Sequence, residues 1–280
     1  MPHVHHGALT SPGSALFTLI VVFTALVYLR GWLRLHSLSL TVIAVWRAVS
    51  FWLGLVLIWV AVASPVARLD HELLTVHMVQ HLLLMTLAPP LIWLGAPLIP
   101  LARGLPRHFV HAVVDPTFQW PAFERLGRVL AQPVFCWLAA AAALLGWHAP
   151  PVFALGLESG AWHTFEHASF LATGLLFWWP VLQPSTNGSK RPDLTIILYL
   201  FLATLPCDIL SGFLVFCDRV VYPAYFSSLR PFGLSALEDQ QCAGALMWIC
   251  VTVVYLVAGA ILTTRLLSAR ISHEGELVHS

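Results

Sequence analysis

Residues 73–102 read LLTVHMVQHLLLMTLAPPLIWLGAPLIPLA and contain no Asp, Glu, Lys or Arg. A stretch of this length is enough to cross a bilayer as an α-helix, which needs about 20 mainly apolar residues. It also carries His77 and His81, whose spacing of four places both imidazoles on one face of such a helix. Polar groups are costly inside a membrane and usually have a function there. The stretch therefore predicts a membrane-spanning helix with a functional site on one face.

The rest of the 280-residue chain has the same apolar character. Hydrophobic residues make up 59% of it and charged residues only 10%, whereas soluble domains carry about 25% charged residues. Further windows hold no charge, or only Asp208: 14–29, 48–67, 129–157, 167–189, 194–217 and 240–264. Because the windows are much longer than the ~10-residue segments of membrane β-barrels, we expect helices. The prediction is an all-α polytopic membrane protein, a bundle of seven transmembrane helices forming a single integral membrane domain over residues 1–280.

The distribution of basic residues predicts the orientation of that bundle. If the N-terminus lies outside, eleven basic residues fall on the cytoplasmic side: Arg30, Arg34, Arg47, Arg103, Arg107, Arg125, Arg128, Lys190, Arg191, Arg265 and Arg270. Only three fall outside: Arg68, Arg219 and Arg230. Cytoplasmic loops are enriched in Lys and Arg, so we expect the N-terminus outside and the C-terminus inside. The net charge of +1 argues against a protein recruited to nucleic acid by charge.

Histidines are the most informative residues. The chain has 14 of them, and in this topology nine fall outside or in the outer part of a span: His3, His5, His6, His71, His77, His81, His148, His163 and His167. His163 and His167, in AWHTFEHASF, repeat the spacing of His77 and His81, and His148 ends the fourth span. Neutral imidazole binds copper, zinc, iron and nickel well, and a thioether favours Cu(I). We therefore predict a metal site on the outer side.

Acidic residues accompany this cluster. On the outer side lie Asp70, Glu72, Glu166, Asp208, Glu238 and Asp239. A carboxylate can bind metal directly or hold the second nitrogen of a ligating imidazole. The predicted metal ligands are His77, His81, His148, His163, His167 and Asp239. Secondary candidates are His71, Met78, Met85 and Glu166, and the donor set by itself leaves the metal open.

The five cysteines form no CxxC pair, so a thiolate zinc or redox motif is not supported. Cys217 and Cys242 fall near the outer ends of the sixth and seventh spans, where an oxidising compartment would permit a disulfide. Cys136 and Cys250 are expected to be small buried apolar residues.

Several motifs together resemble one known family. HMVQHLLL, PPLIWLGAP, WHAPPVF, HTFEH, LLFWWPV, VVYPAY and DQQCAGALMW occur in this order over about residues 60–265, and they resemble the multi-spanning CtaG family, assembly factors of caa-type cytochrome c oxidase in bacteria. The resemblance implies a seven-helix protein of the bacterial cytoplasmic membrane that is needed to mature a haem–copper oxidase. The matching positions are His77, Met78, His81, Trp147, His148, His163, Glu166, His167, Asp239, Gln240, Gly244 and Trp248. His3, His5 and His6 lie outside the matching region, so no family role transfers to them.

The residues and the resemblance together suggest a function, with alternatives. We expect a protein, not an enzyme, that binds copper at the outer membrane face and helps to metallate the catalytic subunit of the oxidase. A haem-binding or haem-insertion protein is one alternative, because histidines of two helices can clamp iron. A membrane metalloenzyme with Glu166 as base is another, although HTFEH is not the HExxH of metalloproteases. A purely structural scaffold also stays open. A retinal-type receptor is excluded, because the only lysine, Lys190, falls in an inner loop.

Overall fold

The structure is a computed structural model that describes residues 12–37, 43–114, 116–117, 120–182, 194–227 and 233–278. Every regular element within these residues is a helix, which confirms the all-α class. Some of the charged residues used to predict the orientation, Lys190, Arg191 and Arg230, lie outside the described residues.

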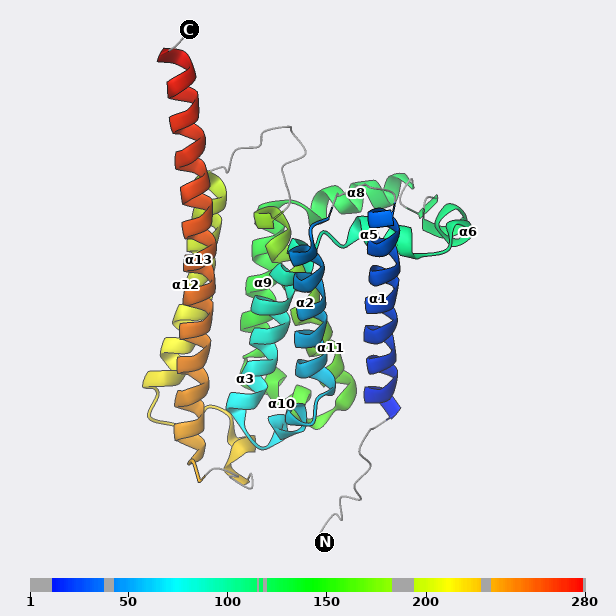
Figure 1. Cartoon of the computed structure of the whole chain (residues 1–280). Helices are drawn as coiled ribbons and strands as arrows, with labels where there is room; N and C mark the ends of the chain where they lie inside the picture. Colours follow the sequence, from blue (N-terminus) through cyan, green and yellow to red (C-terminus); the bar gives the residue numbers. More distant parts are fainter. Residues whose placement is uncertain are drawn as a thin grey trace.

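The long helices run alongside one another between two ends of the molecule (Figure 1). They are α1 (Pro12–Ser37), α2 (Val45–Ala63), the continuous segment of α3 (Leu74–Leu82), η2 (Leu83–Leu87) and α4 (Ala88–Leu94), then α9 (Pro133–Trp147), α11 (Gly160–Leu182), α12 (Leu194–Phe216) and α13 (Ala236–Val278). Short helices lie at the upper end in Figure 1: α5 (Leu98–Gly104), α6 (Arg107–Phe109), η3 (Val110–Val114) and α8 (Pro121–Leu130). Others lie at the lower end: η1 (Val66–His71), α10 (Pro150–Glu158) and η4 (Pro223–Ser227). The start of α1 and the end of α13 lie at opposite ends of the molecule.

Five helical segments among the described residues are long and apolar enough to cross a membrane: Gly13–Ser37, Val45–Ala63, Leu74–Leu94, Leu194–Phe216 and Ala236–Ser268. The helices α9 and α10 are bent by 76° at their junction and make a sixth span if they are counted together. The 23-residue α11 is not among these spans, and its first turns carry His163, Glu166 and His167. The structure thus confirms a multi-pass helical membrane protein with five or six candidate spans.

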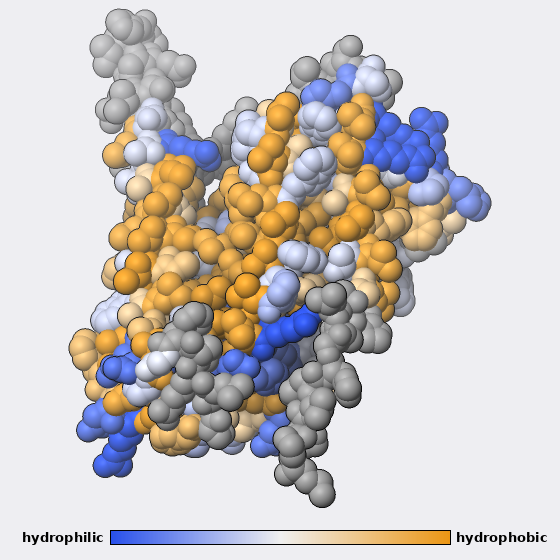
Figure 2. All heavy atoms as spheres, turned by 60° about the horizontal axis from the view of Figure 1, so that its bottom comes forward, coloured by the Kyte–Doolittle hydropathy of each residue, from blue (hydrophilic) through white to orange (hydrophobic). Residues whose placement is uncertain are grey.

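The outer surface of the bundle is apolar where a bilayer would surround it. Large hydrophobic side chains such as Leu19, Ile209 and Leu256 are 66%, 71% and 66% exposed. Figure 2 shows hydrophobic residues over the middle of the visible face and the most hydrophilic residues towards its ends. Exposing so large an apolar area to water is unfavourable, whereas contact with lipid tails is not.

A π-helical turn interrupts the span that carries His77 and His81. In η2 the N–H of Ala88 donates to the carbonyl of Leu83, five residues earlier. Pro89 has no N–H to offer the carbonyl of Met85, and its ring would collide with that carbonyl in a regular α-helix. The wider π turn avoids this collision.

The helix α11 contacts the chain at this π turn through Gly174. A Cβ atom added at Gly174 would lie 2.7 Å from the carbonyl oxygen of Met85 and 2.9 Å from Cγ of Pro89. His77 lies eight residues before Met85, and Glu166 lies eight residues before Gly174. Because α3 and α11 run in the same direction (Figure 1), the contact at Gly174 sets the register that places Glu166 beside His77.

We predict that Gly174→Val destabilises the protein by about 1–3 kcal/mol, the usual cost of overpacking a well-packed site. Gly146→Val in α9 is the matched control, because a Cβ atom there meets nothing within 4 Å. The measurement is the thermal unfolding of both variants and the wild type in detergent. Equal midpoints for the two variants would contradict the close contact at Gly174.

Candidate metal centre

Two histidines of α3 form the centre of the candidate site. The spacing of four residues brings the rings of His77 and His81 to a centroid distance of 4.4 Å. Only 1% of His77 and 4% of His81 is exposed. The sequence-based expectation that the two imidazoles share one helix face is confirmed.

Glu166 of α11 faces both imidazoles. Its Oε1 atom lies 3.5 Å from Nε2 of His77 and 3.2 Å from Nε2 of His81. One potential ligand atom from each of these three residues lies within 4.8 Å of the others, and all three side chains are buried. We call His77, His81 and Glu166 the inner triad.

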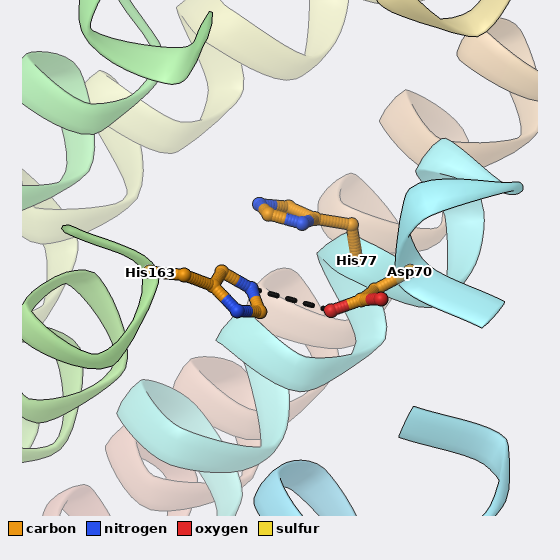
Figure 3. Close-up of side chains that lie close together, drawn as sticks. All are labelled: Asp70, His77 and His163. Carbon is orange, nitrogen blue, oxygen red and sulfur yellow. Dashed lines mark ion pairs between the residues drawn. The ribbon is translucent and has the colours of Figure 1, made fainter. Parts of the chain in front are cut away.

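A second group shares His77 with the first and lies closer to the surface. It consists of Asp70 from η1, His77 and His163 from α11, again with potential ligand atoms within 4.8 Å of one another. Figure 3 shows the three side chains converging, with Nε2 of His163 3.2 Å from Oδ2 of Asp70. We call these residues the outer triad.

Both triads contain buried polar atoms without hydrogen-bond partners. These atoms are both ring nitrogens of His77 and His81, both carboxylate oxygens of Glu166, and Nε2 of His163. The imidazole nitrogens and carboxylate oxygens lie 3.2–3.5 Å apart but are not aligned as hydrogen bonds. A buried polar atom without a partner costs about 1–3 kcal/mol. A cation bound between the side chains would satisfy several of these atoms at once, so the donor set fits a metal ion.

His148 lies beside the inner triad with a defined tautomer. Its Nδ1 lies 2.7 Å from the carbonyl oxygen of Leu144. A carbonyl can only accept, so Nδ1 carries the proton. In the neutral ring, Nε2 then offers a lone pair, and this atom lies 3.1 Å from the thioether sulfur of Met78.

The other candidate ligands lie at different distances from the triads. His167 lies beside His163, with ring centroids 4.2 Å apart, and its buried Nε2 has no hydrogen-bond partner. His71 has a side chain that is 54% exposed and lies 3.8 Å from Oδ1 of Asp70, on the surface side of the outer triad. Met85 lies one turn beyond His81 and lines a neighbouring cavity. His3, His5 and His6 lie outside the described residues.

Asp239 has the contacts of a helix cap. Its carboxylate accepts hydrogen bonds from the backbone N–H of Leu74 at 2.6 Å and of Thr75 at 3.1 Å, and from Oγ1 of Thr75 at 2.6 Å. These donors stand at the start of α3, where backbone N–H groups have no partner within the helix. Asp239 of α13 therefore fixes the start of the helix that carries His77, and it belongs to neither triad.

Asp70 is a candidate ligand that we did not select from the sequence. Its carboxylate is buried because η1 folds back before α3, and no helical spacing links it to His77. The available signal was the acidic side chain in DHE, immediately before the span.

Two tyrosines close the site from the lower end of the molecule. The hydroxyl of Tyr222 donates to the carbonyl of His148 at 3.0 Å, and that of Tyr225 donates to the carbonyl of Asp70 at 2.8 Å. Burial raises the pKa of both phenols above its ordinary value, so both remain protonated donors at neutral pH. Gln240 holds the same segment by accepting from the N–H of Val221. The thiols of Cys217 and Cys242 are both free.

The family of the chain follows from comparison with known proteins. A family model described as cytochrome c oxidase caa3 assembly factor, Caa3_CtaG, matches residues 26–269. The chain belongs to this Caa3_CtaG family. The resemblance drawn from the motifs is thus confirmed.

The similar curated proteins are mycobacterial and carry no assigned function. An uncharacterized protein of Mycobacterium leprae is 24% identical over 225 residues, which are 79% of this chain and 34% of that protein. An uncharacterized protein of Mycobacterium bovis and one of Mycobacterium tuberculosis are each 25% identical over 192 residues, 66% of this chain and 28% of theirs. The chain therefore spans about a third of the length of these relatives. No solved structure matches the chain.

We predict that Asp239→Ala lowers stability by about 1.5–3 kcal/mol, the range for hydrogen bonds to a charged group, and leaves metal binding intact. The neighbouring Glu238→Ala is the control, because Glu238 is exposed and accepts from Ser235 at the start of its own helix. Its effect should be smaller. Thermal unfolding and metal content of both variants test this. Loss of metal in Asp239→Ala alone would favour Asp239 as a ligand.

Proposed function

We propose that this Caa3_CtaG protein binds copper at the outer face of the bacterial cytoplasmic membrane and helps to metallate the catalytic subunit of the oxidase. The observation that carries the proposal is the pair of triads sharing His77, with buried ligand atoms that have no hydrogen-bond partner. Imidazole and carboxylate ligands suit copper, and the thioether of Met78 beside His148 adds a soft ligand that favours Cu(I). Receiving and releasing an ion needs no covalent step, so we propose a non-enzymatic role.

The proposed orientation has seven spans with the N-terminus outside. The helix α11 is the seventh span, because it lies among the other long helices and 23 residues rise about 35 Å as an α-helix. Basic residues support the cytoplasmic assignment of the upper end in Figure 1: Arg34, near the end of α1, donates to the carbonyl of Arg103 in α5. Both triads then lie in the outer part of the bundle.

The inner triad favours an ion over a haem. An axial pair of histidines must leave room for the macrocycle between its rings. His77 and His81 lie on one helix face only 4.4 Å apart, with Glu166 close to both. This arrangement surrounds a compact ion.

We predict that His77→Ala and His77→Ala/Glu166→Gln lower copper affinity by at least ~10–100-fold. That loss is typical when a residue that only hydrogen-bonds a metal ligand is removed, so removing a ligand should cost at least as much. Elemental analysis with an optical spectrum of the detergent-purified protein measures this. His108→Ala in the exposed helix α6, at the opposite end, is the control and should keep its copper. The copper content of the oxidase in cells that make each variant tests the assembly role. Retention of full copper by the double variant, or iron with a Soret band, would contradict the proposal.

The orientation has its own test. In a cysteine-free background, we expect Glu158→Cys at the end of α10 to react with a membrane-impermeant maleimide from outside the cell. Arg107→Cys in α6 should react only after the membrane is opened. Both native side chains are exposed, so access to solvent is matched. The reverse pattern of labelling would place the N-terminus inside.

A further inference from the structure

A narrow cavity lies beside the inner triad, between the α12–α13 pair and the rest of the bundle. His81 and His148 contribute to its wall. None of its lining residues, all within the described part of the chain, is Asp, Glu, Lys or Arg. The cavity is therefore an apolar compartment that adjoins the imidazoles.

Sulfur atoms gather around this cavity. Met85, Cys207 and Met247 line it, and each is at least nine-tenths buried. The chain has four methionines, of which one is Met1. The other three are Met85, Met247 and Met78, and Met78 contacts His148 at the cavity wall. All three methionines of the described residues thus lie at this cavity or beside its wall.

The helical register places the sulfur atoms deeper in the bundle than the triads. Asp239 of α13 is level with Thr75 of α3 because the two residues are hydrogen-bonded. Counting about 1.5 Å per residue along both helices, His81 stands about 9 Å above that level, Met247 about 12 Å and Met85 about 15 Å. On α12, Ser211 lies against Gly244, so Cys207, one turn away, is near the level of Met247.

We infer that Met85, Cys207 and Met247 form a second site, which takes Cu(I) from the imidazole cluster and holds it before release towards a partner within the membrane. This inference rests on the proposed function, since the imidazole cluster would supply the ion. Soft thioether and thiol ligands select Cu(I). An apolar cavity without acidic residues opposes a divalent ion, because burying net charge is costly, and a monovalent ion carries less of it. The ion keeps its oxidation state throughout.

The order of ligands gives the transfer a direction. The side chain of His71 is 54% exposed, that of His163 is 17% exposed, and those of His77 and Glu166 are each 1% exposed. His81 then belongs both to the inner triad and to the wall of the cavity. The donors therefore change from imidazole and carboxylate near the surface to sulfur in the interior.

Silver(I) is the probe for the sulfur site, because it is a soft monovalent ion without redox chemistry. We expect the wild-type protein to bind Ag(I) with sulfur neighbours in X-ray absorption. The variant Met85→Leu/Cys207→Ala/Met247→Leu should lose these sulfur neighbours and at least part of its silver, while retaining copper in the triads. Cys217→Ala/Cys242→Ala, which removes thiols outside the cavity lining, is the control and should behave like the wild type.

The variant His77→Ala/Glu166→Gln separates the two proposals. If the inference is right, this variant loses triad copper but still binds Ag(I) with sulfur neighbours. The inference is overturned if the sulfur variant keeps the Ag–S signal, or if cells with that variant make an oxidase with full copper content. The proposed function fails separately, if the triad variant keeps all its copper. Met85→Leu and Met247→Leu conserve side-chain volume, and their unchanged melting would show that any loss of silver is not unfolding.

Discussion

The contact between Gly174 and the π turn at Met85 is the constraint on which the rest of the site depends. A helix that carries three polar residues in its first turns would not ordinarily pack deep against another span. The missing side chain of Gly174 and the widened turn before Pro89 let the two backbones approach. Since α3 and α11 run in the same direction, this one contact brings Glu166 to His77 and His81, and His163 to Asp70.

Burying polar groups in this way costs free energy. Hydrogen bonds from the surrounding residues restrict that cost to a small number of atoms. Asp239 satisfies the start of α3, Tyr222 and Tyr225 satisfy carbonyls of His148 and Asp70, and Gln240 ties down the segment before them. Because of these hydrogen bonds, the backbone N–H and C=O groups named above have partners. Most of the buried side-chain atoms without partners among the described residues belong to the triads, which is the distribution expected of a ligand site.

The sequence predicts the helices and the histidine pairs because both follow from local spacing. Charge-free windows anticipate the spans, and the four-residue spacing anticipates the contact of His77 with His81. The cap formed by Asp239 could not be foreseen in this way, because it joins residues 164 positions apart in the chain. The same holds for Asp70, whose position depends on how η1 folds back onto the bundle. Hydropathy alone also leaves the number of spans open. The polar residues His163, Glu166 and His167 lower the mean hydropathy of α11, which is not among the candidate spans.

The proposed copper function gives a physical reason for placing these side chains inside a membrane bundle. A copper ion in water is strongly hydrated, and an apolar interior can take it only where ligands replace that hydration. The triads offer imidazole and carboxylate, and the outer triad reaches the surface through the partly exposed His163. Deeper in the bundle, Met85, Cys207 and Met247 offer neutral, soft sulfur atoms, which could hold a monovalent ion without a buried counter-charge. In the proposed function, such a sulfur site would pass Cu(I) to a partner inside the membrane, at a depth that a soluble carrier does not reach.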